Sequence, residues 1–515
     1  MLQPMMNTYM DTRGLNADNP AFSDVIVKGI APGGGLFVPR DIPHLTLDDL
    51  KALAPLSYPQ RAAAIYKAFG VDFPDQQIEE LMAGAYADNF DDPAIAPIKE
   101  VKPGLHVLEL WHGPTSAFKD MALQCLPRFF SAAVEKQAAE QGSAHDYLIL
   151  VATSGDTGKA ALAGFADRPH TKIAVFYPHG GVSDIQRLQM ATQRGDNVMV
   201  FAARGNFDDC QTSVKRTFND EKYNAQLAAR HELRLSSANS ISWGRLMPQI
   251  VYYVSSYVTM ASRGDIAFGD PIDVCVPTGN FGNILGAWYA RTMGTPIEHL
   301  LCASNENRVL TDFLTTGTYD INDRQFVLTP SPSMDILVSS NVERQLFELT
   351  DRDGSRIAEW MRQLRENRRF TLDPETFSRI QEVYRADSVD NATCLATIRE
   401  VYEETGYLLD PHSAVAFKVA ERLKGDNPVL VASTAHWAKF GANVFRALHG
   451  IAPDAALPDK VAQLSGIELD RRIAEKAGSY VPAGLDELDA LPERFNQVID
   501  GSLDGVEGAL DSWLG

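Results

Sequence analysis

Two polar, glycine-rich stretches of the sequence are candidates for anion binding. Thr153–Gly158 reads TSGDTG and Pro277–Asn283 reads PTGNFGN, and each lies between an apolar run and a helical pattern. At such strand-to-helix turns, backbone amides at the helix N-terminus can bind a carboxylate or a phosphate. Neither stretch has the GxxxxGK[ST] or GxGxxG spacing of nucleotide-binding loops. We therefore expect sites for small anions, including a phosphorylated cofactor. The alternative is that each stretch is an ordinary capped turn.

A third stretch, WHGPTSAFKDMAL, places Lys119 at the start of a helical pattern. A cation is poorly placed at a helix N-terminus, and the apolar side chains of Phe118, Met121 and Ala122 would remove water from it. Both effects favour the neutral amine, which can form a Schiff base with an aldehyde cofactor and then act as a general base. The alternative is a surface lysine paired with Asp120.

The elements expected around these stretches alternate between strand and helix. Short β-branched runs predict buried strands, and apolar residues at three-and-four spacing predict helices. The predicted strands are Tyr147–Ala152, Lys172–Tyr177, Asn197–Ala202, Ile272–Val276 and Pro428–Ala432. The predicted helices are Leu47–Phe69, Asp75–Tyr86, Ala160–Ala166, Asp184–Arg194, Phe207–Phe218, Leu246–Ser262 and Ile284–Met293. This order is typical of doubly wound, mostly parallel α/β sheets, which bind ligands at the carboxyl ends of their strands.

Composition and charge exclude several classes of protein. The 515 residues include 47 Lys and Arg against 67 Asp and Glu, and the net charge of −20 argues against nucleic acid or an anionic membrane as the main partner. The five cysteines are widely spaced, and neither a CxxC pair nor an HExxH pattern is present, so we assign no metal. The sequence contains no secretory signal and no apolar run of about 18 residues, which favours a cytoplasmic protein.

Taken together, the motifs resemble those of threonine synthase, a pyridoxal-phosphate enzyme family with the tryptophan-synthase-β-like fold. The resemblance rests on FKD, SGDTG, GNFGN and STAHWAKF, and also on YMDTRG, APGGGL, SPSMDI and NVER, in the same order over residues 9 to 450. It implies a two-lobed α/β core with doubly wound, mostly parallel sheets and a small N-terminal domain. We expect this N-terminal domain over 1–95, the core over 96–450 with its smaller lobe at about 120–250, and a peripheral C-terminal extension over 451–515.

The resemblance also implies a role for each candidate site residue. Lys119 would bind the pyridoxal 5'-phosphate cofactor covalently. The hydroxyl of Thr434 would meet the pyridine nitrogen, where a neutral group moderates electron withdrawal. The cofactor phosphate would be held by Gly279, Asn280, Phe281, Gly282 and Asn283. The substrate would be held by Thr153, Ser154, Asp156 and Thr157, and its phosphate by Asn239, Ser240 and Arg245, whose planar guanidinium suits a phosphate.

The activity implied is the last step of threonine biosynthesis, in which O-phospho-L-homoserine and water give L-threonine and phosphate. The reaction is a γ-elimination followed by addition of water at the β-carbon, with Lys119 as the base. A dehydratase, a phospholyase for another phosphorylated amino alcohol, and a paralogue that binds without turnover are alternatives. Arg245 favours a phosphorylated substrate. We expect a monomer or homodimer, and we interpret His412 and His436 as structural. Trp437 departs from the proline of the family's TAHPAKF motif.

Overall fold

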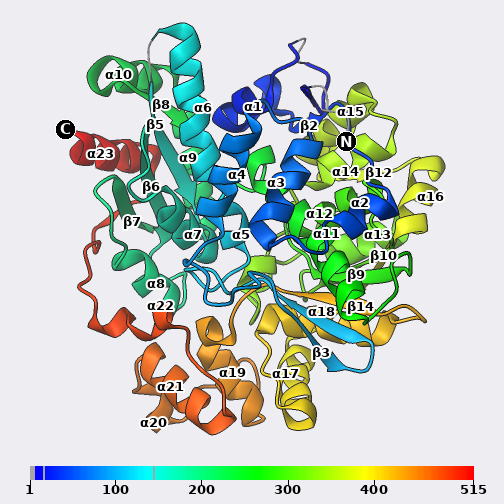
Figure 1. Ribbon diagram of the computed structural model, residues 1–515. Coiled ribbons are helices and arrows are strands. Elements are labelled where there is room, and N and C mark those ends of the chain that lie inside the picture. Colours follow the sequence, from blue (N-terminus) through cyan, green and yellow to red (C-terminus); the bar gives the residue numbers. More distant parts are fainter. Residues whose placement is uncertain (1–5, 16–17, 143–144) are drawn as a thin grey trace.

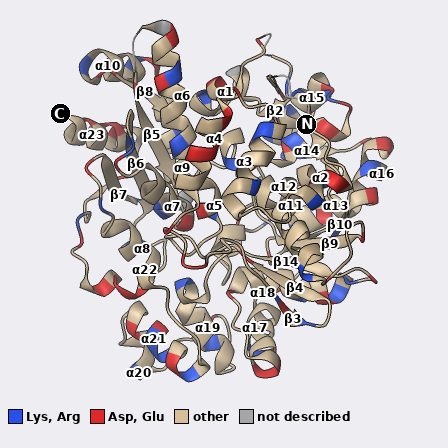
Figure 2. Cartoon of the chain, in the orientation of Figure 1, with Lys and Arg blue, Asp and Glu red and all other residues tan. Residues whose placement is uncertain are grey.

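The computed structural model describes residues 6–15, 18–142 and 145–515, and contains two central sheets covered by helices (Figure 1). Each sheet forms the middle of one lobe, which is the layered arrangement of an α/β fold. Charged residues lie mainly on the outer helices and loops, whereas the central strands contain few of them (Figure 2). Among the described residues, no helix is both long and apolar enough to cross a membrane.

The larger lobe contains a six-stranded sheet with the order β13-β10-β9-β14-β4-β3. Its neighbours are parallel except for the edge pair β3 and β4. The strands are β3 (Ile98–Lys102), β4 (Leu105–Glu109), β9 (Ile272–Pro277), β10 (Ile297–Ser304), β13 (Tyr384–Ser388) and β14 (Val429–Ser433). The helices of this part of the chain are α11 (Trp243–Arg263), α12 (Gly282–Thr292), α13 (Val309–Thr316), α14 (Val342–Leu349), α15 (Gly354–Asn367), α16 (Pro374–Val383), α17 (Asn391–Thr405), α18 (Pro411–Leu423) and α19 (Gly441–Leu448). A small antiparallel pair joins β11 (Thr318–Asp320) to β12 (Arg369–Thr371).

The smaller lobe contains a parallel five-stranded sheet with the order β15-β7-β6-β5-β8. Its strands are β5 (Asp146–Ala152), β6 (Thr171–Pro178), β7 (Val198–Arg204), β8 (Leu233–Ser236) and β15 (Val498–Asp500). Its helices are α5 (Lys119–Leu123), α6 (Leu126–Gln141), α7 (Asp156–Phe165), α8 (Asp184–Ala191), α9 (Phe207–Asn219) and α10 (Glu221–His231). Leu148, Ile149, Leu150 and Val151 of β5 are fully buried, as expected for a strand with helices on both faces.

The described residues of the N-terminal region form a two-stranded antiparallel sheet and four α-helices. The sheet pairs β1 (Tyr9–Asp11) with β2 (Phe37–Pro39), and the helices are α1 (Phe22–Lys28), α2 (Leu47–Ala52), α3 (Tyr58–Ala68) and α4 (Asp75–Ala85). The single helix expected over Leu47–Phe69 is therefore wrong. Pro55 disfavours helical geometry at the residue before it, which accounts for the break between α2 and α3.

The chain after residue 451 packs on both lobes. The short helices α20 (Asp459–Ala462), α21 (Gly466–Ala477) and α22 (Ala483–Asp486) precede β15, which adds to the edge of the smaller sheet beside β7. Helix α23 (Leu503–Leu514) then packs on α9 and buries Val506 and Leu510 completely (red in Figure 1). The expectation of a peripheral extension is wrong, because this segment completes the sheet and the core of the smaller lobe.

Candidate active site

Two segments from distant parts of the sequence meet beside Lys119. The backbone amide of Phe118 donates to the carbonyl of Thr434 at 2.8 Å, and that of His436 donates to the carbonyl of Ser116 at 3.1 Å. These bonds join the residues after β14 to the turn before α5. Since β4 and β14 are parallel neighbours, their carboxyl ends lie at the same edge of the sheet. This edge places Thr434 close to Lys119, as the sequence predicts for two residues that follow neighbouring strands.

Lys119 is the first residue of α5, and its side chain is half-buried. Within the described part of the chain, its ammonium has no hydrogen-bond or ion-pair partner. Burial lowers the pKa of Lys119 to about 8, with Asp156 opposing this effect and Arg245 adding to it. Asp120 instead accepts from the amide and hydroxyl of Thr115, at 2.8 and 2.7 Å. The alternative of a surface Lys119–Asp120 pair is therefore wrong, and the amine is available to react.

The loop between β9 and α12 has the shape of an anion cradle. A Cβ atom at Gly279 would lie 2.9 Å from the carbonyl oxygen of Ser333, so the close approach of these two segments requires glycine. Phe281, the N-cap of α12, is held at a positive φ of 60°, an uncommon geometry for a side chain of this size. The loop leads into the first turn of α12, where helical geometry leaves amides without partners.

Asn283 adds a buried donor to this cradle. Its Oδ1 accepts from the hydroxyls of Tyr252 and Tyr253, at 2.6 and 2.5 Å, which fixes the orientation of the side-chain amide. Its Nδ2 is buried and has no partner. A buried donor without a partner is costly unless a ligand satisfies it. The residue types of this loop therefore fit a bound phosphate group.

The TSGDTG loop between β5 and α7 is organised by the hydroxyl of Thr153. This hydroxyl accepts from the amides of Gly155 and Gly158, at 3.0 and 2.9 Å. Gly155 has a φ of 137°, and a Cβ atom there would lie 2.4 Å from the side chain of Gln186. Ser154 and Thr157 are half-exposed, and in the described ranges neither hydroxyl has a protein partner. Thr153 thus shapes the loop, while Ser154 and Thr157 present free hydroxyls.

Asp156 forms a buried ion pair with Lys439, a residue to which the sequence analysis gave no role. The Nζ of Lys439 lies 2.8 Å from Oδ1 of Asp156 and also donates to the carbonyl of Thr115 at 2.8 Å. Gln186 donates to the same Oδ1 at 2.9 Å. Burial alone would raise the pKa of Asp156, but the charges of Lys439 and Lys119 outweigh it and hold that pKa well below its usual range. Only the STAHWAKF motif, which includes Lys439, could have indicated this pair.

Arg245 lies in the first turn of α11, and only 3% of the residue is exposed. Its Nη1 donates to the carbonyl of Ala238 at 2.7 Å, and its Nε is buried without a partner. Burial lowers the pKa of Arg245 to about 10, so the guanidinium is charged at neutral pH. No carboxylate of the described residues lies within ion-pair distance of it. Asn239 and Ser240 lie in the turn before α11 and are half-exposed. A buried guanidinium with no counter-ion favours an anionic ligand.

His412, His436 and Trp437 have structural contacts. His412 bonds Asp410 at 2.8 Å and accepts from the amide of Ser333 at 3.1 Å. His436 caps the turn at 437–440, and burial lowers the pKa of this histidine to about 3, so it is neutral at pH 7. The indole of Trp437 donates to Ser479 at 3.1 Å, so the residue that departs from the family motif packs against the C-terminal segment.

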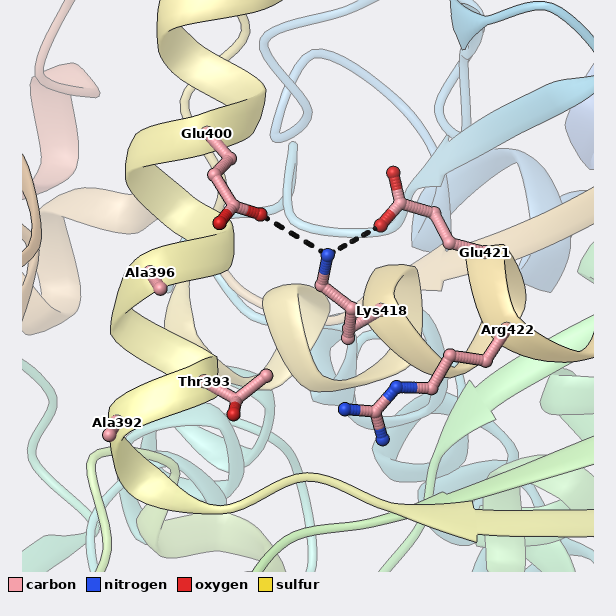
Figure 3. Close-up of a pocket in the computed structure, with 7 residues that line it drawn as sticks. All are labelled: Ala392, Thr393, Ala396, Glu400, Lys418, Glu421 and Arg422. Carbon is pink, nitrogen blue, oxygen red and sulfur yellow. Dashed lines mark hydrogen bonds and ion pairs between the residues drawn. The ribbon is translucent and has the colours of Figure 1, made fainter.

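A surface groove between α17 and α18 contains none of the expected site residues (Figure 3). Its lining is Ala392, Thr393, Ala396, Glu400, Lys418, Glu421 and Arg422. The ammonium of Lys418 pairs with Glu400 at 3.2 Å and with Glu421 at 2.8 Å, so these charges compensate one another. We therefore place the candidate active site around Lys119 and not in this groove.

Comparison with known proteins gives matches along most of the chain. The model of the threonine synthase N terminus matches residues 8–86, that of pyridoxal-phosphate dependent enzymes matches 93–434, and that of the threonine synthase C-terminal region matches 413–477. Threonine synthase of Pseudomonas aeruginosa is 37% identical over 460 residues, which cover 88% of this chain and 93% of the relative. The chain belongs to the threonine synthase family.

Solved structures and longer relatives place the chain within the threonine synthase family. The crystal structure of pyridoxal-phosphate-bound threonine synthase from Brucella melitensis is 36% identical, with a TM-score of 0.85 over 98% of this chain and 99% of that one. The expected two-lobed fold is thereby confirmed, and the family model of pyridoxal-phosphate dependent enzymes over residues 93–434 supports the expected pyridoxal 5'-phosphate cofactor. Threonine synthase-like 1 of Homo sapiens is 42% identical over 436 residues, which are 83% of this chain. The chain spans only 58% of that relative's length.

Proposed function

We propose that this chain is a threonine synthase, which converts O-phospho-L-homoserine and water into L-threonine and phosphate. The observation that carries the proposal is Arg245, a buried guanidinium without a counter-ion in the same site as the free amine of Lys119. A substrate phosphate would supply the missing counter-charge. A dehydratase acting on an unphosphorylated hydroxy amino acid would leave Arg245 buried and unpaired, which is costly.

The residues of the site fit the cofactor of the family. Lys119 would bind its aldehyde carbon, the amides of the Gly279–Asn283 loop and the Nδ2 of Asn283 would bind its phosphate, and the hydroxyl of Thr434 would face its ring nitrogen. The support for this assignment is the free amine of Lys119 and the buried, unpaired Nδ2 of Asn283. When bound, pyridoxal phosphate withdraws electrons from the substrate and so makes the proton on the α-carbon acidic.

The residues of this chain would then bind the substrate and transfer its protons. The hydroxyls of Ser154 and Thr157, together with the turn shaped by Thr153, would bind the substrate carboxylate. Arg245, Asn239 and Ser240 would bind its phosphate. The amine of Lys119 would take the proton from the α-carbon and return protons in later steps, as a general base and acid. Oδ1 of Asp156 is already bonded to Lys439 and Gln186. Asp156 would therefore affect the substrate indirectly, through Lys439 and Lys119.

The direct test is to incubate the purified holoenzyme with O-phospho-L-homoserine and to measure phosphate and threonine in the same samples. Equal amounts of both are expected. Phosphate released together with a keto acid would instead identify a phospholyase that does not add water. No product from a cofactor-loaded protein would contradict both activities and favour a paralogue that binds without turnover.

We also propose a cytoplasmic location and a monomeric or homodimeric state. All five cysteines are buried free thiols, which suits a reducing compartment. Light scattering coupled to gel filtration would test the oligomeric state, and a tetramer or larger species would contradict the proposal.

A further inference from the structure

Asn341 connects the two loops to which we assign phosphate binding. It precedes α14 and is fully buried. Its Nδ2 donates to the carbonyl of Ser240 at 3.2 Å and to that of Asn280 at 3.1 Å. Its backbone amide also donates to the carbonyl of Asn280, at 3.1 Å. One side-chain amide thus joins the loop expected to hold the substrate phosphate, through Ser240, to the loop expected to hold the cofactor phosphate, through Asn280.

Arg344 fixes the orientation of Asn341 and reaches two other segments. Its Nη1 donates to Oδ1 of Asn341 at 2.6 Å, which directs Nδ2 of Asn341 towards the two loops. Its Nη2 donates to the carbonyl of Ile241 at 2.5 Å, and its Nε donates to that of Phe37, in the N-terminal region, at 2.9 Å. The guanidinium also lies 6.0 Å from the ring of Trp243, the first residue of α11. Arg344 therefore contacts the turn that leads directly to Arg245.

The neighbouring residue, Glu343, holds α14 against the N-terminal region. Its two carboxylate oxygens accept from Nε and Nη2 of Arg13, both at 2.9 Å, and one of them also accepts from the hydroxyl of Thr12 at 2.6 Å. Glu343 is thus already paired, and among the described residues no carboxylate lies within ion-pair distance of Arg344. Burying Arg344 fully without a counter-ion is costly, and three hydrogen bonds to neutral oxygens compensate only part of that cost.

We propose that Asn341 and Arg344 are positioning residues for the substrate phosphate. Through Ser240 and Ile241 they hold the turn before α11 in the geometry that presents Ser240 and Arg245 to one anion. The bond from Arg344 to the carbonyl of Phe37 also connects the N-terminal region to this turn. The inference rests on the proposed function, because it assigns the substrate phosphate to this loop. A site for a rigid anion depends on donors that are fixed before binding. Loosening this turn should therefore weaken phosphate binding more than it slows the chemical step.

The test compares Arg344→Met, Arg344→Lys and Asn341→Ala in the holoenzyme. Arg352→Met is the matched control, because Arg352 also donates to a carbonyl of the N-terminal region, that of Arg40, but has no contact with residues 239–245. Hydrogen–deuterium exchange of residues 237–244 and calorimetric binding of inorganic phosphate are measured for each protein. Steady-state kinetics with O-phospho-L-homoserine and the cofactor absorbance complete the set.

We expect Arg344→Met and Asn341→Ala to speed exchange at 237–244 and to weaken phosphate binding by about tenfold or more, the usual cost of losing hydrogen bonds that hold a charged site. The KM for the phosphorylated substrate should rise by a similar factor, with kcat within about twofold and the cofactor retained. Arg344→Lys should lie between wild type and Arg344→Met. Arg352→Met also loses the ion pair with Glu348, but it should keep the wild-type exchange at 237–244, phosphate affinity and KM.

Unchanged exchange and phosphate affinity in both Arg344→Met and Asn341→Ala would overturn the inference. Faster exchange over residues 18–86 without faster exchange at 237–244 or weaker phosphate binding would also overturn it, because Arg344 would then only dock the N-terminal region. If Arg344→Met does not fold, Arg344→Lys and Asn341→Ala decide the question. Exchange and phosphate binding need no turnover, so failure of the proposed reaction can be distinguished from failure of this inference.

Discussion

Lys119 owes its expected reactivity to its surroundings. The carboxylate next to it in sequence, Asp120, is bound by Thr115, and the carboxylate close to it in space, Asp156, is paired with Lys439. The amine therefore keeps a lowered pKa although two acidic residues are near. A buried carboxylate that is paired with one lysine raises the pKa of a second lysine less than an unpaired carboxylate would. One site can therefore hold both an acidic residue and a reactive amine.

The first prediction concerns the pH dependence of cofactor attachment. Only the neutral amine attacks an aldehyde, and the pKa of Lys119 is lowered to about 8. The rate at which pyridoxal phosphate binds covalently to the apoprotein should therefore rise with pH and level off above about 8. Stopped-flow absorbance across a pH series measures this rate.

Asp156→Asn provides the companion measurement. Removing this negative charge removes an interaction that raises the pKa of Lys119, so the midpoint should move to lower pH. Lys119→Ala should show no covalent attachment. A midpoint near 10.5, the ordinary value for lysine, would show that burial does not lower the pKa of Lys119.

The second prediction concerns Arg245→Ala. Loss of a charge-assisted contact to the substrate phosphate should lower kcat/KM for O-phospho-L-homoserine by about 10- to 100-fold. The matched control is Arg263→Ala at the other end of α11, where Arg263 pairs with Asp265, and its kinetics should match wild type. Equal kinetics for Arg245→Ala and wild type would move the phosphate site elsewhere.

Residue-level prediction worked where one residue type is chemically distinctive. The apolar neighbours of Lys119 indicated the lowered pKa correctly, because these neighbours are local in sequence. The pair between Asp156 and Lys439 has no local signal, because the two residues are far apart in the chain and meet only at the junction of the lobes. The individual roles assigned to the three loops remain predictions.

At the scale of elements, the ends of strands β5 and β9 determine where the two glycine-rich loops that follow them lie. Buried strands with continuous apolar runs, such as β5, β6, β9 and β14, were predicted to within about two residues because their composition is distinctive. β10 was not predicted. Its first half, which reads IEHL, mixes polar and apolar residues, so the run gives a weaker signal.

The third prediction tests the turn after β5. Gly155→Ala would force a residue with a side chain into a φ of 137° and bring its Cβ to 2.4 Å from Gln186. We expect a loss of about 1–3 kcal/mol in stability and a raised KM, because the turn carries Ser154 and Asp156. Gly180→Ala is the control, since Gly180 also has a positive φ, of 76°, but has no atoms within 4 Å of an added Cβ.

Thermal unfolding and steady-state kinetics would separate the two variants. Gly180→Ala should lose stability without a change in KM. If Gly155→Ala also leaves KM unchanged, the TSGDTG turn does not contact the substrate.

At the scale of the whole molecule, the C-terminal segment belongs to the core of the smaller lobe. Ile499, Val506 and Leu510 are buried against it, and each buried aliphatic side chain contributes about 1.5–3 kcal/mol. The hydroxyl of Tyr223 on α10 also donates to Asp511 at 3.1 Å. No sequence pattern indicated this, because three residues of edge strand pair with β7 nearly three hundred positions earlier.

The fourth prediction follows from this packing. Deleting residues 498–515 should expose the edge of β7 and the apolar face of α9, so the smaller lobe should unfold at a lower temperature and the protein should aggregate more readily. Hydrogen–deuterium exchange of β7 and α9 would locate the effect. As a milder variant, Leu510→Ala should lose about 2–5 kcal/mol without removing the strand. Unchanged exchange in β7 would contradict this role for β15.

The place of β15 also affects the order in which the chain can fold during synthesis. Four of the five strands of the smaller sheet have been synthesised by residue 236, but the fifth is complete only when residue 500 is reached. While the residues between β8 and β15 are made, the edge of β7 in this parallel sheet has no partner strand. Chaperones that shield apolar surface on nascent chains would be most needed during that interval.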